Sequence, residues 1–414
     1  MKILHLSTSD IDGGAARAAY RLHEGLNKVG VSSQMLVRDK QTSSAAVVRD
    51  TSVITKLGPI FNRLPLRKYP GRDSVMFSSQ WFPDSLAKSI SAINPDVVQL
   101  HWVCNGFLQI ETLKKINRPI VWMLHDMWPF TGGCHYTQGC DRYKNQCGSC
   151  PILRSQKQKD VSFHTLQRKI KAWRDLSLTI VTPSQWLANC ANESTLFKHR
   201  SVQVIAGGLN TDVFRPGLKQ AARKILNLPQ DKKLLLFVAG STTGDPRKGF
   251  KYLIEALNLQ QQQGNDTLEL AILGEEAPTD PVPLAFKTHY LGRFNDEISL
   301  ALVYNAADVF VAPSIQDNLP NTVMEALGCG TPCVAFKIGG MPDMIDHQKN
   351  GYLASPFEVA DLGKGIEWVL GDQGRYAELA VNARQKAERA FDSRQQAIKF
   401  VELYKSLIED ASAL

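Results

Sequence analysis

Short apolar runs alternate along the whole chain with polar loops and with segments of helical periodicity. In the first half, the runs that we predict to be strands lie at 1–8, 31–37, 94–102, 119–126, 178–184 and 202–205. In the second half, they lie at 233–240, 268–273, 288–291, 307–311 and 333–336. Short runs of this kind are typical of strands buried on both faces, and strands that alternate with helices form parallel sheets. The pattern therefore predicts an α/β fold.

The alternation of strands and helices is interrupted by the run 206–216, which is dense in glycine and turn formers. We therefore expect an N-terminal domain at 1–205 and a C-terminal domain at 206–393. Each would be a Rossmann-like, doubly wound parallel sheet, and the two would face a cleft. A last helix is predicted at 394–410 by its apolar side. We expect the segment from about 394 to 414 to pack back onto the N-terminal domain.

The composition is that of a globular chain, because 43% of its 414 residues are apolar. No apolar run approaches the ~18 residues that cross a bilayer. The apolar stretch at the start is too short for a signal peptide and fits a first strand instead. We therefore expect a cytoplasmic protein.

The net charge of +8 is distributed unevenly. Residues 1–205 carry 27 Lys and Arg against 14 Asp and Glu, whereas residues 206–414 carry 21 against 26. Much of the excess comes from 55–68, where apolar and basic residues interleave, and from a predicted helix within 153–178 that has a cationic face. A basic domain suits an anionic membrane surface or a phosphorylated acceptor. For 55–68, an ordinary solvated helix remains the alternative to membrane contact.

Nucleic acid would be another anionic partner for a basic domain. The chain shows no helix-turn-helix, no zinc-finger spacing of the DNA-reading kind and no aromatic RNA-binding signature. We therefore expect no nucleic-acid partner.

Four of the eight cysteines cluster in a polar, glycine-rich stretch of the first half. They are Cys134, Cys140, Cys147 and Cys150. A cytosolic chain keeps its thiols reduced, so the cluster favours a structural zinc ion over disulfides, although only Cys147 and Cys150 have the usual Cys-x-x-Cys spacing. Redox-labile or ordinary loop cysteines remain the alternative. The other four cysteines lie in apolar surroundings and are predicted to be core thiols.

Candidate ligand-binding groups follow several strands of the first half. Gly13 and Gly14 lie at a strand-to-helix turn, where glycine lets the backbone approach a ligand and the helix N-terminus attracts anions. A tight turn that needs glycine explains the pair equally well. The absence of Gly-x-Gly-x-x-Gly argues against a dinucleotide. His101 and His125 each end a strand; we favour a structural role for His101 and a functional one for His125, which Asp126 could orient.

The second half offers two cations and two carboxylates. Arg247 and Lys248 stand at a helix entrance, where they would hold a diphosphate by charge-assisted bonds or form an exposed basic turn. Asp317 is expected in a loop and Glu325 on the helix that Pro320 opens, since proline is favoured at a first helical position. Both carboxylates could then face one polar ligand beyond the end of a strand. A solvated loop acid and a helix-surface glutamate are the plainer interpretation.

Together these motifs resemble those of the family 4 glycosyltransferases, whose GT-B fold has two Rossmann-like domains. The similarity runs along nearly the whole chain and is greatest to bacterial exopolysaccharide enzymes of the colanic-acid type. The stretches that carry it are Gly13-Gly14, 125–134 (His-Asp-Met-Trp-Pro-Phe-Thr-Gly-Gly-Cys), Arg247-Lys248-Gly249, Leu291-Gly292, 307–314, 317–325 and Gly339-Gly340.

The resemblance implies that a sugar is transferred, with retention of configuration, from a UDP- or GDP-linked donor to a lipid-linked saccharide, without a cofactor for catalysis. It implies that His125 and Asp317 contact the donor sugar, that Glu325 binds the ribose, and that Arg247 and Lys248 neutralise the diphosphate. The further donor-binding candidates are Gly13, Gly14, Gly292, Phe294, Asn318, Leu319, Pro320 and Asn321. The candidates for acceptor contact are Arg17, His101 and Asp126. Such an enzyme is expected at the inner face of the plasma membrane.

Two positions depart from the family pattern. The family usually has glutamate where this chain has Asp317, and its usual arginine shortly before Lys248 is missing, because residues 241–243 are Ser-Thr-Thr. Arg247 would then take the place of that arginine. Two alternatives to transfer remain, namely a GT-B epimerase or phosphorylase, and a scaffold that binds a nucleotide sugar without catalysis.

Overall fold

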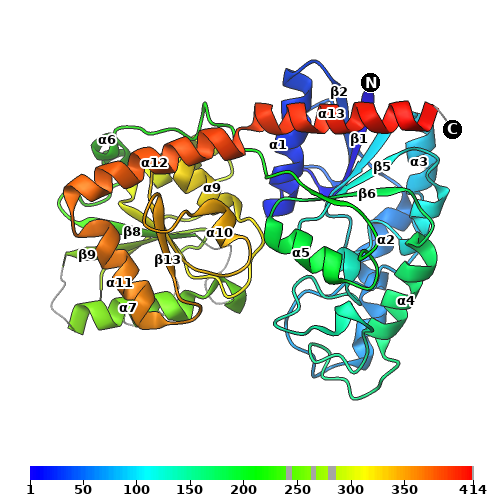
Figure 1. The fold of residues 1–414 in the computed structure, drawn as a ribbon, viewed down its shortest axis with the longest axis horizontal. Coiled ribbons are helices and arrows are strands. Elements are labelled where there is room, and N and C mark those ends of the chain that lie inside the picture. The colour runs from blue at the N-terminus through cyan, green and yellow to red at the C-terminus, as the bar shows by residue number, and fades with distance from the viewer. Residues whose placement is uncertain (239–244, 263–266, 278–285, 413–414) are drawn as a thin grey trace. The chain divides into compact units, whose positions relative to one another are not determined.

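The computed structural model describes residues 1–238, 245–262, 267–277 and 286–412. It divides into two compact units (Figure 1). The first unit consists of Met1–Gly208 and Arg394–Leu414, and the second consists of Leu209–Ser393. The chain therefore leaves its first unit once and returns to it with its last helix.

The N-terminal unit is built on a parallel sheet of seven strands in the order β3-β2-β1-β4-β5-β6-β7. The strands are β1 (Lys2–Ser9), β2 (Ser32–Asp39), β3 (Val47–Arg49), β4 (Val97–Leu100), β5 (Ile120–Met123), β6 (Leu178–Thr182) and β7 (Val202–Val204). Because chain order reverses beside β1, the carboxyl ends of β1 and β4 flank the point at which doubly wound sheets bind ligands.

Helices cover both faces of this sheet. They are α1 (Gly14–Lys28), α2 (Val53–Asn62), α3 (Leu86–Ile93), α4 (Val161–Trp173), α5 (Gln185–Glu193) and α13 (Ser393–Ser412), with short 3-10 helices at Leu64–Lys68, Ile110–Lys115, Trp128–Phe130 and Arg142–Lys144. On one face, α1 and α13 pack in one apolar cluster with residues of β1, β4, β5 and β6. On the other face, α3, α4 and α5 share a larger cluster with the sheet. Helix α13 contributes Ala397, Phe400 and Tyr404 to the first of these clusters.

The C-terminal unit repeats the architecture with a parallel sheet of six strands in the order β10-β9-β8-β11-β12-β13. Its strands are β8 (Lys233–Val238), β9 (Leu268–Leu273), β10 (Thr288–Tyr290), β11 (Val309–Ala312), β12 (Cys333–Phe336) and β13 (Gly351–Ala354). Its helices are α6 (Lys219–Ile225), α7 (Phe250–Gln262), α8 (Glu297–Ala306), α9 (Asn321–Gly328), α10 (Met341–Met344), α11 (Val359–Leu370) and α12 (Gln373–Phe391), with a 3-10 helix at Pro246–Lys248. The α/β fold expected from the sequence is therefore confirmed in both units.

The observed elements differ from the expected ones mainly at their ends. Strands β3 and β13 were not expected, because each is short and β13 follows directly on a turn. Pro320 precedes the first residue of α9 instead of occupying its first turn. The end of the predicted strand at 239–240 lies outside the described residues. No helix in the described ranges is both long and apolar enough to cross a membrane.

One buried hydrogen bond ties α13 to the N-terminal sheet and can be tested. The Tyr404 hydroxyl donates to Oε1 of Gln99 in β4 at 2.8 Å. We expect Tyr404→Phe to lower the free energy of unfolding by about 1–2 kcal/mol, because the buried amide oxygen loses its partner. Urea unfolding measures the change. An unchanged unfolding midpoint would contradict the prediction. The matched control is Tyr252→Phe, because the hydroxyl of Tyr252 makes no hydrogen bond within the described part of the chain.

Candidate active site

Two sets of polar groups lie at strand ends, one in each unit. In the C-terminal unit, Lys248 Nζ donates to Oδ2 of Asp317 at 2.7 Å, and Arg247 Nη1 lies 3.2 Å from the same oxygen. The carboxylate is buried, and its Oδ1 accepts the Asn318 backbone N–H at 3.0 Å. The adjacent cations Arg247 and Lys248 therefore form one cluster with Asp317, which lies far from them in the sequence and follows β11.

Close backbone approaches hold this cluster together. Gly249 has a φ of 72°, and a Cβ there would lie 1.8 Å from the carbonyl oxygen of Pro313. Gly339 has a φ of 51°, and a Cβ there would lie 1.9 Å from the carbonyl oxygen of Asp317. Any other residue at either position would force the backbone apart. The two glycines therefore allow the loop with the cations and the loop after β12 to meet around Asp317.

Electrostatics favours the ionised form of Asp317. Burial alone would raise the pKa of its carboxyl, but Lys248 and Arg247 outweigh burial and lower the pKa to about 2. Arg247 also donates from Nη2 to Asp245 at 2.9 Å and from Nη1 to the Gln316 carbonyl at 2.9 Å. The guanidinium is therefore oriented by three groups, of which the sequence motif contains only Asp317.

Glu325 occupies a different environment from that of Asp317. It lies on α9, is only 3% exposed, and its Oε2 accepts a hydrogen bond from the Tyr304 hydroxyl at 2.8 Å. Tyr304 belongs to α8 and was not expected at the site, because no local spacing relates α8 to α9. The interpretation of Glu325 as an exposed helix-surface residue is wrong, since the carboxylate is buried.

The other donor-binding candidates of this unit lie along the same strand ends. Asn318 and Leu319 are buried, Pro320 immediately precedes α9, and Asn321 is its first residue. Gly292 follows β10 with a φ of 65°, and its carbonyl accepts the N–H of Gly274 at 2.7 Å. Phe294 is partly exposed. The Ser-Thr-Thr stretch at 241–243 lies outside the described residues.

In the N-terminal unit, the glycine pair lies where the sequence predicts it. Gly13, with a φ of 89°, immediately precedes α1, and Gly14 is the first residue of that helix. Arg17 lies in the first turn and is partly exposed. The carboxylate of Asp10 accepts the backbone N–H groups of Gln41 and Thr42. The first turn of α1 contains no acidic residue.

His125 lies after β5 and is held by another histidine. His101 Nδ1 lies 3.1 Å from Nε2 of His125, and the two rings stack with centroids 5.3 Å apart. Burial lowers the pKa of His125 to about 4, although Asp126 acts in the opposite direction. His125 is therefore neutral at physiological pH. His101 is buried.

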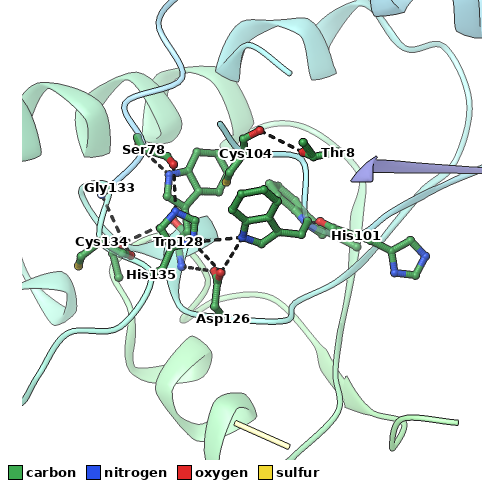
Figure 2. Close-up of polar contacts among 12 residues, drawn as sticks. Thr8, Ser78, His101, Cys104, Asp126, Trp128, Gly133, Cys134 and His135 are labelled. Atoms are coloured by element: carbon green, nitrogen blue, oxygen red, sulfur yellow. Dashed lines mark hydrogen bonds and ion pairs between the residues drawn. The ribbon is translucent and has the colours of Figure 1, made fainter. Parts of the chain in front are cut away.

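Asp126 has its own buried partners (Figure 2). Its Oδ2 accepts hydrogen bonds from Nδ1 of His135 at 2.6 Å and from Nε1 of Trp102 at 3.0 Å. Its Oδ1 accepts the backbone N–H of Trp128 at 2.9 Å. Burial would raise the pKa of Asp126, but His135 lowers it below its ordinary value. Asp126 therefore pairs with His135, a partner that the sequence did not indicate.

A buried lysine supports the loop that follows Asp126. Lys169 of α4 donates from Nζ to the carbonyl oxygens of Trp128 and of Thr131, the latter at 3.0 Å. The ammonium lies 3.6 Å from the ring centroid of Trp128. Burial lowers the pKa of Lys169 to about 7. One residue of the predicted cationic helix is therefore a core residue that fixes the 125–134 motif.

The predicted zinc site concerns the four clustered cysteines of the N-terminal unit. Cys134, Cys140, Cys147 and Cys150 are free and line one pocket. Over the residues that the structure describes, however, no group of three or more His, Cys, Asp or Glu side chains is placed to hold a metal ion. Burial raises the pKa of Cys147 to about 12 and that of Cys134 well above its usual value, so both are neutral thiols. Apolar packing dominates the surroundings of Cys134 and Cys150.

The pairing of Asp317 with the two cations makes a pH-dependent prediction. A carboxyl whose pKa is lowered on folding contributes stability that is present above its unfolded pKa of about 3.9 and is lost as the pH falls to about 2. We expect Asp317→Asn to lower the free energy of unfolding by about 2 kcal/mol at pH 7, and by progressively less from pH 4 downwards. Urea unfolding from pH 7 to pH 3 measures this. A pH-independent difference would contradict the prediction, and the exposed Asp231→Asn is the control.

Known proteins share this chain's sequence and architecture. It is 31% identical over 227 residues to D-inositol 3-phosphate glycosyltransferase 2 of Catenulispora acidiphila, covering 51% of this chain and 52% of that protein. It is 24% identical to WcaC of Escherichia coli K12, described as a colanic acid biosynthesis glycosyl transferase, over 98% of this chain and all of that one. The chain spans about half the length of the first of these relatives and the full length of the second.

A solved structure and two family descriptions match as well. HepE of Anabaena, in complex with UDP-glucose, superimposes with a TM-score of 0.64 at 18% identity, over 100% of both chains, which shows a shared fold. The description "Glycosyltransferase Family 4" matches residues 12–213, and "Glycosyl transferases group 1" matches residues 219–386. The first match covers the glycine pair and the histidine motif, and the second covers the cluster around Asp317. The chain therefore belongs to family 4 of the glycosyltransferases, with the two-domain GT-B fold.

Proposed function

We propose that this protein is a retaining glycosyltransferase that moves a sugar from a nucleotide diphosphate sugar to a saccharide during synthesis of a surface polysaccharide. The observation that carries the proposal is the pairing of Lys248 and Arg247 with the buried, ionised Asp317 at the strand ends of the C-terminal unit. The descriptions of WcaC and of the HepE complex with UDP-glucose support the substrate class. In this proposal, the C-terminal unit binds the donor and the N-terminal unit binds the acceptor.

The proposed reaction requires charge stabilisation at the leaving group. The bond between the anomeric carbon and the diphosphate oxygen breaks, and its electron pair passes to the nucleoside diphosphate. The acceptor hydroxyl oxygen bonds to the same face of that carbon and gives its proton to the departing phosphate oxygen. Lys248 and Arg247 would stabilise the developing negative charge, because preorganised cations need no reorganisation during the reaction. The protein then needs no nucleophile of its own.

The hydrogen bonds of the two carboxylates support a separate proposed role for each. Asp317 would hold the two cations in position, since its Oδ2 already accepts from Lys248. A carboxylate has about four lone-pair sites, so a contact with the donor sugar remains open to it. Glu325 would bind the ribose hydroxyls. Its hydrogen bond from Tyr304 restricts the side chain and would orient it for this contact.

The N-terminal unit would supply the remaining contacts. Gly13 and Gly14 would let the donor approach the N-terminus of α1, where the helix dipole and the backbone N–H groups favour a phosphate. His125 would contact the donor sugar near the reacting carbon. Arg17, which lies in the first turn of α1, would meet the acceptor.

An unusual helix supports the proposal that the acceptor is lipid-linked and that the enzyme works at the inner face of the plasma membrane. Helix α2 buries Thr55, Gly58 and Asn62 and leaves apolar side chains in solvent. The exposed apolar residues are Val53, Ile54, Leu57 and Ile60. The basic residues Lys56, Arg63, Arg67 and Lys68 are exposed in the same segment. An apolar surface beside cations suits an anionic membrane interface better than it suits water.

The proposal predicts the behaviour of Glu325→Gln. The change keeps the size of the side chain and removes its charge, so kcat/KM for the donor should fall by about tenfold to hundredfold. Release of nucleoside diphosphate from purified protein, in the presence of acceptor saccharide, measures the effect. Glu367→Gln, on the exposed surface of α11, is the matched control and should retain full activity.

The same assay separates the alternatives. Nucleoside diphosphate that forms only with acceptor present supports transfer. Interconversion of nucleotide sugars without acceptor would instead establish an epimerase, and phosphorolysis of a glycan would establish a phosphorylase. Wild-type polysaccharide in cells that carry only Glu325→Gln, with none in a deletion strain, would favour a scaffold.

The exposed apolar face of α2 makes a separate prediction. Ile60→Glu should weaken binding to vesicles that contain anionic lipid by about tenfold or more, because burial of an isoleucine side chain contributes about 1.5–3 kcal/mol. Co-sedimentation at low and high salt measures the binding. Ile298→Glu, at an even more exposed apolar position in the other unit, should bind like the wild type. Full solubility of the wild type with vesicles at low salt would contradict membrane contact.

A further inference from the structure

Three histidines form a row across neighbouring strands of the N-terminal sheet. His5 lies within β1, His101 follows β4 and His125 follows β5. His5 is in register with Gln99, and Gln99 is in register with Val121. His101 is two positions beyond Gln99, and His125 is four positions beyond Val121. Because side chains two apart share a face of a strand, all three histidines lie on one face and step towards the carboxyl edge.

Hydrogen bonds run along the whole row. His5 Nδ1 lies 2.9 Å from Nε2 of His101, and His101 Nδ1 lies 3.1 Å from Nε2 of His125. The rings stack with centroids 5.2 Å and 5.3 Å apart. His5 is 0% exposed and His101 is 3% exposed, whereas His125, which follows the carboxyl end of β5, is partly exposed. The row therefore links the core of the unit to the strand end where His125 lies.

The three rings are neutral at physiological pH. Burial, together with the other histidines, lowers the pKa of His5 and of His101 well below the usual value. Burial lowers the pKa of His125 to about 4. A neutral imidazole carries one N–H and one bare nitrogen. Each hydrogen bond in the row therefore needs a donor nitrogen on one ring and a bare nitrogen on the next.

This requirement couples the three rings. If His5 donates from Nδ1, then Nε2 of His101 is bare, Nδ1 of His101 donates to His125, and His125 must carry its proton on Nδ1. If His125 instead donates from Nε2, every proton in the row moves to Nε2, including that of His5. Only these two arrangements make both hydrogen bonds.

The inner end of the row distinguishes the two arrangements. His5 Nε2 is buried and has no hydrogen-bond partner among the described residues. In the first arrangement this atom is a bare acceptor, and in the second it is an N–H without an acceptor. In protein interiors a buried N–H group without an acceptor is the rarer of these two cases. The first arrangement is therefore favoured.

We propose that His5 and His101 are positioning residues that act through the row to keep the proton of His125 on Nδ1. His125 would then offer a hydrogen-bond donor at Nδ1 and never a bare nitrogen there, which suits contact with an oxygen of a sugar. A contact of this N–H group with substrate rests on the proposed function, in which His125 contacts the sugar of the nucleotide sugar. The arrangement of protons in the row does not depend on the proposed function.

Nitrogen NMR of protein labelled with ¹⁵N-histidine tests the row without substrate. Protonated and bare imidazole nitrogens have well-separated shifts, and the signals of His125 are assigned by their loss in His125→Gln. We expect a protonated Nδ1 and a bare Nε2 on His125 in the wild type. A protonated Nε2, or averaged shifts for the two nitrogens, would overturn the proposal.

Variants test whether the row imposes this state. His101→Phe removes both hydrogen bonds, and His5→Phe removes the inner one; each should give His125 averaged nitrogen shifts. His23→Gln is the matched control, because His23 is buried on α1 with its ring centroid 5.9 Å from that of His5 but is outside the row. It should leave the signals of His125 unchanged. Wild-type signals in folded His101→Phe would overturn the proposal, and the wild-type spectrum decides the matter if that variant does not fold.

Activity separates this inference from the proposed function. We expect His101→Phe to lower kcat by up to about tenfold, with His23→Gln at the wild-type value. If the spectra show the expected state but neither His101→Phe nor His125→Gln changes kcat, the proposed contact of His125 with the donor fails and the row stands. If the spectra show a mixed state while His125→Gln abolishes activity, the contact stands and the row fails.

Discussion

All strands in each sheet run in the same direction, so the carboxyl ends of the strands gather at one edge of each unit. At that edge the chain turns from buried apolar strand to polar loop. Polar groups buried there need partners, because an unpaired buried hydrogen-bonding group or charge is costly. Asp317 is paired with Lys248, Asp126 with His135 and His101 with His125. These pairings determine which side chains remain available for chemistry.

In the C-terminal unit, pairing produces a preformed set of charges. Asp317 stays ionised in a buried position only because two cations outweigh the effect of burial. The cations are in turn held by the same carboxylate, and Gly249 and Gly339 allow the backbone to come close enough for this. A diphosphate would then meet cations that are already in place. This preorganisation, more than the number of charges, is what a transferase of nucleotide sugars requires.

In the N-terminal unit, the same constraint separates residues that are adjacent in the sequence. Asp126 forms hydrogen bonds with Trp102 and His135, whereas His125 contacts His101.

Helix α2 has the reverse of the usual distribution of side chains, because its buried residues are small or polar and its exposed residues are largely apolar. Exposed apolar side chains gathered on one helix are the observation on which the proposed membrane contact rests.

Periodicity and turn residues in the sequence alone were enough to determine the two parallel α/β sheets, because these features depend on local patterns that repeat every few residues. The order of motifs was enough to determine the family. Only the tertiary structure decided that Glu325 is buried against Tyr304, that Asp126 pairs with His135 and that His5 contacts His101. Each of these depends on strand register and helix packing, which bring together residues whose separation in the chain carries no local signal.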